Sequence, residues 1–193
     1  MSSLPVSAAV LLGSYLIGSL VMGVLYSRLR GTDIRDKDLP GASGTFRQYG
    51  AAAGATVMVL DFVKGMVAVG LARYFAPDAM WLAVFGVVLG HCYPVYFRFN
   101  GGAGVAPFGG AFLVASPIAA IPTYVLALAL IPVYKRTLQP RLKMNAVPAV
   151  SVAMLPIGIV FSLLFGGLVS FLAGGVVMVL RGLQMLRSPE REA

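Results

Sequence analysis

Residues 51–75 read AAAGATVMVLDFVKGMVAVGLARYF, an apolar run interrupted near its middle by Asp61 and Lys64. A helix of this length extends about 37 Å, enough to cross the ~30 Å hydrocarbon core of a bilayer. A lone charge at the centre of such a helix costs about 2.5 to 3.5 kcal/mol. Because the acid and the base are three residues apart, they share one helix face, and we expect them to support each other. Two interpretations stay open: a structural ion pair between helices, and a place in the wall of a polar site.

The same apolar character extends along the whole chain. Of its 193 residues, 59% are hydrophobic and only 11% are charged, and the mean hydropathy is +0.87. Soluble domains carry about 25% charged residues, so water cannot be the main solvent of this chain. The sequence therefore predicts an all-α integral membrane protein, a single membrane-embedded domain over residues 1–193 with no room for a soluble one.

Seven apolar stretches alternate with polar or glycine-rich segments. The stretch 105–115 is too short to cross a bilayer and follows a glycine cluster, so we expect its helix to begin inside the protein, below the membrane surface. The predicted seven-helix transmembrane bundle consists of residues 4–29, 51–75, 79–97, 105–115, 118–134, 146–165 and 168–186.

Basic residues predict the orientation of this bundle. With the N-terminus outside, 13 of the 15 lysines and arginines lie on the inner side or at inner span ends, so the positive-inside rule favours N-out and C-in. The net charge of +8 does not indicate nucleic acid, because the cations form no single tract. It favours membrane lipids with anionic headgroups as partners. The inner cations are Arg28, Arg30, Arg35, Lys37, Arg47, Arg98, Lys135, Arg136, Arg141, Lys143, Arg181, Arg187 and Arg191.

The segment GHCYPVYFRFNGGAGVA, residues 90–106, is the first candidate for chemistry. Gly101, Gly102 and Gly104 precede a predicted helix, where backbone N–H groups can form a cradle for phosphate. Arg98 beside them favours that interpretation. A membrane turn also needs glycine, so both interpretations stay open.

His91 lies in the same segment and is the chain's one histidine. A histidine near a membrane end either packs as a satisfied core residue or acts as a base, and its closeness to the glycines raises the second possibility. Together with Cys92 as the one cysteine, it excludes a metal cluster of histidines and cysteines. We expect no cofactor.

The first inner loop, residues 30–50, reads RGTDIRDKDLPGASGTFRQYG and is too charged to cross a bilayer. Ser43 and Arg47 follow small residues that can wrap an anionic substrate, and an arginine there would clamp a phosphate through two hydrogen bonds. The alternative is a solvated loop whose cations only set the topology.

Taken together, these segments resemble the PlsY family of acyl-phosphate-dependent glycerol-3-phosphate acyltransferases. The resemblance covers about the first 120 residues in the family's order, whereas the last third matches only in hydropathy and number of spans. The residues that carry it are Tyr15, Gly18, Ser19 and Gly23; Gly31, Asp33 and Arg35; Pro40, Gly41, Ser43, Arg47 and Gly50; Asp61, Lys64 and Gly65; and Gly90, His91, Pro94, Phe99, Gly101, Gly102, Gly104, Val105 and Ala106.

The resemblance implies an enzyme of the bacterial cytoplasmic (inner) membrane. It would transfer an acyl group from acyl phosphate to glycerol-3-phosphate, making lysophosphatidic acid without metal or coenzyme A. Arg47 and His91 would be the catalytic residues. The substrate-binding residues would be Ser43, Gly101, Gly102, Gly104, Asp61, Lys64 and Arg98.

Several family residues are missing. Ala103 stands where the family has the lysine of its glycine turn, and Lys37 and Leu39 stand at the positions of a family serine and asparagine. Of the family's C-terminal motif, only Arg181, Arg187 and Glu190 remain as faint traces. These departures leave a second function open, a catalytically impaired paralogue that binds lipid or a partner membrane protein. A small transporter fits less well, because the polar residues gather at the inner helix ends and not at the midplane.

Overall fold

The structure, a computed structural model, describes residues 3–142 and 146–187. Lys143, Arg191 and Glu190, which the sequence analysis included among the inner cations and the C-terminal traces, lie outside this range. Within it all regular secondary structure is helical, with ten α-helices and three short 3-10 helices. The α-helices are α1 (Leu4–Ser19), α2 (Met22–Arg28), α3 (Ala42–Tyr49), α4 (Ala51–Phe75), α5 (Met80–Cys92), α6 (Val105–Ala115), α7 (Pro117–Thr137), α8 (Gln139–Leu142), α9 (Ala146–Phe165) and α10 (Leu168–Arg187).

The predicted apolar segments are all helical, but two of them are interrupted. The first is not one continuous helix, because α1 ends at Ser19 and α2 begins at Met22, with Val21 extended between them. The third stops as an α-helix at Cys92 and continues through a 3-10 helix, Val95–Phe97. Both interruptions leave backbone groups without helical partners, and other parts of the chain supply those partners.

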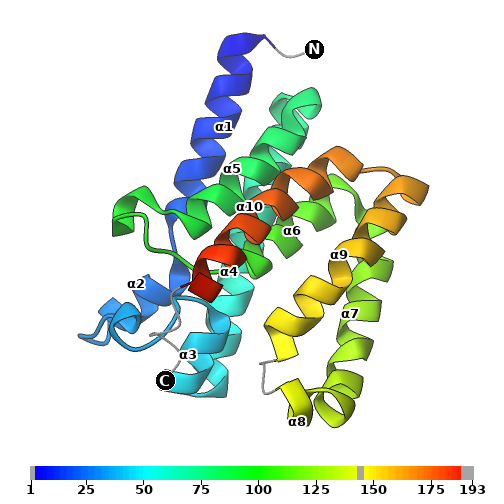
Figure 1. Cartoon of the computed structure of the whole chain (residues 1–193). Coiled ribbons are helices and arrows are strands. Elements are labelled where there is room, and N and C mark those ends of the chain that lie inside the picture. Colours follow the sequence, from blue (N-terminus) through cyan, green and yellow to red (C-terminus); the bar gives the residue numbers. More distant parts are fainter. Residues whose placement is uncertain (1–2, 143–145, 188–193) are drawn as a thin grey trace.

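The core lies where α4, α5, α6 and α10 meet. Phe108 and Phe112 of α6 stack on each other, and Phe171 of α10 packs edge-on against both, with ring centroids 5.5 and 5.2 Å away. Figure 1 shows α10 crossing the middle of the bundle, with α7 and α9 side by side as an antiparallel pair. The two C-terminal helices are thus tied to the rest of the bundle by α9, which packs on α7, and by α10, which packs on α5.

Glycines let the helices of this bundle approach closely. A Cβ on Gly18 of α1 would stand 2.2 Å from the carbonyl oxygen of Val87 in α5, and one on Gly90 would stand 2.1 Å from that of Tyr15. Gly65 and Gly110 make the same kind of contact between α4 and α6, at 2.1 and 1.9 Å. Because lipid provides no hydrophobic force between helices, the van der Waals attraction of this close packing is the main force that holds the helices of the bundle together.

The outside of the bundle is apolar and its inside holds charges, the arrangement expected in lipid. Leu12, Leu128 and Leu163 are more than 60% exposed, while Asp61 and Lys64 are buried. Among the described residues, five helical segments are long and apolar enough to cross a membrane, and α6 and residues 149–165 are shorter apolar helices. Helix α6 would reach only about 16 Å, and it begins among buried residues, as the sequence predicted.

Candidate functional site

Asp61 and Lys64 form the expected ion pair, at 2.7 Å between Oδ1 and Nζ. Their side chains are only 1% and 5% exposed. The ammonium also lies 2.9 Å from Nδ1 of His91, whose side chain is 3% exposed. The acid, the base and the imidazole therefore form one buried polar cluster, which confirms the ion pair; a place in the wall of a substrate site stays a prediction.

This cluster holds the broken first span at both of its helix ends. Lys64 donates to the carbonyl oxygens of Gly18, at 3.0 Å, and Leu20, at 2.7 Å, where α1 ends. Asp61 accepts the Met22 amide, at 3.4 Å, where α2 begins. A cation stabilises a helix C-terminus and an anion stabilises a helix N-terminus, so the pair is placed to stabilise the break between α1 and α2.

The segment after α5 folds back on that helix as a tight hook, residues 93–104. The amide of Gly101 donates to the Cys92 carbonyl, and that of Gly102 donates to the His91 carbonyl. Arg98 and Phe99 both adopt left-handed backbone conformations, with φ of 55° and 58°. Two consecutive non-glycine residues in this region cost free energy that the surrounding contacts must offset.

These bonds change the expected role of the glycines. Because the amides of Gly101 and Gly102 already have acceptors, they do not point freely into a cradle. Among the described residues, the amides of Ala103 and Gly104 have no acceptor. The amides at the start of α6 lack an acceptor within their own helix, as at any helix N-terminus. The glycine turn thus offers fewer backbone donors than its sequence indicates.

Close contacts explain why glycine stands at the two paired positions. A Cβ on Gly101 would lie 2.0 Å from the His91 carbonyl oxygen, and one on Gly102 would lie 2.4 Å from the imidazole Nε2. The Cβ position of Gly102 would also lie 3.1 Å from the carbonyl oxygen of Pro40. Gly102 is therefore the place where the inner loop, the histidine and the hook come together.

Arg181 of α10 brings a cation to the hook. Its Nη2 donates to the Gly101 carbonyl oxygen at 2.7 Å, and its guanidinium lies 5.5 Å from the ring centroid of Tyr93. Its Nε is buried and has no hydrogen-bond partner among the described residues. The sequence identifies this arginine only as an inner cation and a trace of a C-terminal motif, because Gly101 lies 80 positions away along the chain.

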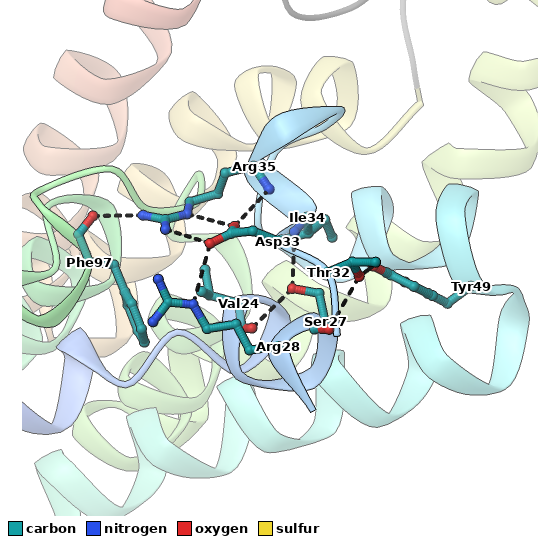
Figure 2. A network of polar contacts seen from close by, with 9 residues as sticks. All are labelled: Val24, Ser27, Arg28, Thr32, Asp33, Ile34, Arg35, Tyr49 and Phe97. Carbon is teal, nitrogen blue, oxygen red and sulfur yellow. Dashed lines mark hydrogen bonds and ion pairs between the residues drawn. The ribbon is translucent and has the colours of Figure 1, made fainter. Parts of the chain in front are cut away.

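A second network ties the inner loop to the hook (Figure 2). Asp33 binds Arg35 through two pairs of atoms, at 2.6 and 2.8 Å, and also accepts from Arg28 at 3.3 Å. Arg35 in turn donates to the Phe97 carbonyl at 2.8 Å, and both guanidiniums lie over the Phe97 ring. These bonds lower the pKa of Asp33 to about 2 and raise that of Arg35. This part of the loop is thus a structured brace.

The predicted residues of the inner loop lie on α3. Arg47 donates to the Asp38 carboxylate through two nitrogens, with Nε at 2.7 Å from Oδ2. Ser43 is exposed in the first turn of the same helix. The structure thus pairs Arg47 with an acid, and the loop before α3 reaches the hook at Pro40.

Arg98 is exposed, and within the described part of the chain it has no hydrogen bond or ion pair. It therefore stands apart from the buried cluster of Asp61, Lys64 and His91. The same part of the chain contains no group of three or more histidine, cysteine and acidic side chains placed to hold a metal ion.

A family model and several known proteins match most of this chain. The family model described as Glycerol-3-phosphate acyltransferase matches residues 8–183. Glycerol-3-phosphate acyltransferase 2 of Deinococcus radiodurans is 60% identical over 145 residues, which cover 73% of this chain and 74% of that protein. Glycerol-3-phosphate acyltransferase 1 of Dehalococcoides mccartyi is 39% identical over 127 residues, covering 63% and 61%.

A solved structure has the same fold. The crystal structure of PlsY, an integral membrane glycerol 3-phosphate acyltransferase, in its glycerol 3-phosphate form, superposes with a TM-score of 0.77 at 27% sequence identity, covering 97% of this chain and 94% of that one. These similarities confirm the family that the order of motifs predicted and do not favour the catalytically impaired alternative. The chain belongs to the glycerol-3-phosphate acyltransferase family.

Proposed function

We propose that the chain transfers an acyl group from acyl phosphate to the 1-hydroxyl of glycerol-3-phosphate. The hydroxyl oxygen forms a bond to the acyl carbon, the bond from that carbon to the phosphate oxygen breaks, and the proton leaves with inorganic phosphate. The products are lysophosphatidic acid and phosphate. For this reaction the protein must mainly bind two phosphates and orient the hydroxyl toward the acyl carbon. Positioning and charge compensation therefore account for most of the rate enhancement.

One observation carries this proposal: three distant parts of the chain meet at the hook and at the end of α5, on which the hook folds back. The inner loop reaches it through Pro40 and Arg35, α4 reaches His91 through Lys64, and α10 reaches Gly101 through Arg181. Family motifs that are far apart in the sequence thus surround one segment.

Charge for two substrate phosphates is available around this segment. Arg47 on α3, Arg98 on the hook and Arg181 on α10 are cations of the kind that binds phosphate. Arg47 would exchange part of its pairing with Asp38 for a substrate oxygen. In this proposal Arg181 takes over the countercharge that Ala103 does not provide, and Ser43 and the free amides before α6 add neutral donors.

We also propose a place for this site. The chain forms one unit over residues 1–193 with seven spans, N-out and C-in, in the bacterial cytoplasmic membrane, and the hook, α2 and α3 face the cytoplasm. The distribution of 13 of the 15 basic residues supports this orientation. Both phosphorylated substrates are then bound from the inner side.

A donor comparison tests the proposed reaction. Purified protein in detergent receives labelled glycerol-3-phosphate with either palmitoyl phosphate or palmitoyl-coenzyme A, and labelled lysophosphatidic acid is measured. We expect product and an equal amount of inorganic phosphate with the acyl phosphate only. Product with the thioester alone would show a different donor, and no product with either from folded protein would favour the catalytically impaired paralogue.

A further inference from the structure

The two ring nitrogens of His91 face different surroundings. Nδ1 lies 2.9 Å from Nζ of Lys64, deep in the buried cluster. Nε2 faces Gly102, where a Cβ would stand only 2.4 Å away, and has no hydrogen-bond partner among the described residues. Whichever nitrogen carries the proton decides what the imidazole can do toward the hook.

The surroundings of Lys64 fix the position of that proton. Three groups within 3.0 Å of Nζ can only accept hydrogen bonds: the carbonyl oxygens of Gly18 and Leu20 and the carboxylate of Asp61. An ammonium group has three N–H donors, which these acceptors share with Nδ1, and it has no lone pair. It can therefore face Nδ1 of His91 only if that nitrogen is an acceptor.

The other arrangements leave a polar group without a partner. A proton on Nδ1 would point at the ammonium, and the carboxylate oxygen Oδ1 of Asp61 is 3.6 Å from Nδ1, too far to accept a good hydrogen bond. A neutral Lys64 amine could accept from Nδ1, but it would leave the Asp61 carboxylate, 2.7 Å away and 1% exposed, without a countercharge, which is costly in a buried site.

We propose that Lys64 is a positioning residue that holds His91 as the neutral tautomer with its proton on Nε2. The imidazole then directs an N–H donor toward the hook at Gly102, where a Cβ would stand only 2.4 Å from Nε2. A histidine with a protonated Nε2 cannot take a proton from the attacking hydroxyl. It acts instead as a hydrogen-bond donor to a substrate oxygen, in place of the role as a base that the sequence left open.

The inference rests on the proposed function for the identity of that oxygen, but the tautomer can be measured without turnover. Because the chain has one histidine, protein labelled with ¹⁵N-histidine gives a single pair of ring signals. In the wild type we expect the ¹⁵N chemical shift of Nδ1 to be that of an unprotonated ring nitrogen and the shift of Nε2 to be that of a protonated one. The opposite assignment would overturn the proposal, and this result needs no variant.

Two variants test the part played by Lys64. Lys64→Met keeps the length of the side chain and removes its donors, so the preference for the Nε2 proton should fall from nearly complete to a mixture. Arg73→Met is the matched control in the same helix, because Arg73 donates to Val114 at the far end of α4 and should leave the tautomer unchanged. A tautomer that is the same in Lys64→Met as in the wild type contradicts the positioning role.

Replacing the histidine tests the donor itself. His91→Gln can place an amide N–H near the position of Nε2, whereas the shorter His91→Asn places its amide near Nδ1. We expect kcat/KM for acyl transfer to fall about tenfold or less in the first and roughly 10²- to 10³-fold in the second, the usual loss of one aimed donor. Equal losses in both would contradict the donor role. An inactive wild type with the Nε2 proton in place would overturn the proposed function and leave the tautomer assignment standing.

Discussion

Asp33 illustrates how a single carboxyl braces the inner loop. Its bonds to Arg35 and Arg28 lower its pKa from the usual 3.8 to about 2. A carboxyl whose folded pKa lies below its unfolded pKa stabilises the fold above the unfolded value, and this stabilisation is lost as the pH falls through the folded value. The contribution of Asp33 is therefore complete above about pH 4 and disappears toward pH 2.

Asp33→Asn should remove this contribution. We expect a lower Tm in detergent at pH 7, and a gap between wild type and variant that closes as the pH falls from about 4 to 2. Asp36→Asn, which changes an exposed carboxyl three residues after Asp33, serves as the control. A gap that stays constant across this pH range would mean that the brace is not electrostatic.

Ala103 is the residue where this chain departs most clearly from the family it resembles. It is exposed on the hook, next to the amides that have no acceptor, so a longer side chain has room there. Ala103→Lys should add a charge-assisted hydrogen bond worth about 1.5 to 3 kcal/mol, or roughly ten- to a hundred-fold in affinity for glycerol-3-phosphate. Isothermal titration of wild type and variant measures this gain.

The gain should depend on Arg47, which is proposed to bind the same phosphate. In an Arg47→Ala background the added lysine should raise affinity much less. If Ala103→Lys leaves the affinity of folded protein unchanged, the hook is not a phosphate site.

At the scale of helices, close backbone contact between α1 and α5 holds the bundle together. Gly18 lies against the Val87 carbonyl, whereas Gly13, five residues earlier in α1, has open space where a Cβ would stand. Gly18→Ala should therefore cost about 1 to 3 kcal/mol of overpacking, and Gly13→Ala should gain about 0.5 to 1 kcal/mol of helix stability. Denaturation of both variants in mixed detergent micelles would measure the difference, and equal effects would show that the contact between α1 and α5 is looser than described.

The helices were predictable from the sequence, but their interruptions were not. Residues 51–75 and 105–115 are helical over the predicted range, because long apolar runs in lipid have few alternatives to a helix. The break after Ser19 depends on Lys64 and Asp61, more than 40 residues away along the chain. The residues around Ser19 therefore do not predict it. Likewise, nothing in the glycine cluster shows that two of its amides bind the end of α5.

For the whole molecule, hydropathy and charge already indicated the class of protein. The structure adds which polar segments meet, and it brings Arg181 to a hook that the sequence had connected only with Arg47, His91 and Arg98. Contacts of this kind join residues of different helices, so spacing along one chain does not predict them.

The proposed orientation can be tested with the intact protein. A phosphatase or fluorescent reporter fused after Ala193 should read as cytoplasmic, because 13 of the 15 basic residues then lie on the inner side. The same reporters fused before Met1 should give the opposite result. A C-terminal reporter that reads as external would contradict the topology and with it the cytoplasmic entry of both substrates.

Our central claim is that the hook around Gly102 is the site of acyl transfer, and one comparison of rates tests it most directly. Formation of lysophosphatidic acid from glycerol-3-phosphate and acyl phosphate is measured for wild type, Gly102→Ala and the control Gly13→Ala, each shown to be folded. A methyl group at Gly102 would stand 2.4 Å from Nε2 of His91, whereas one at Gly13 meets nothing within 4 Å. We predict that wild type and Gly13→Ala turn over at similar rates, while Gly102→Ala loses at least a hundred-fold, roughly the effect of one displaced donor. Undiminished turnover in folded Gly102→Ala would contradict the claim.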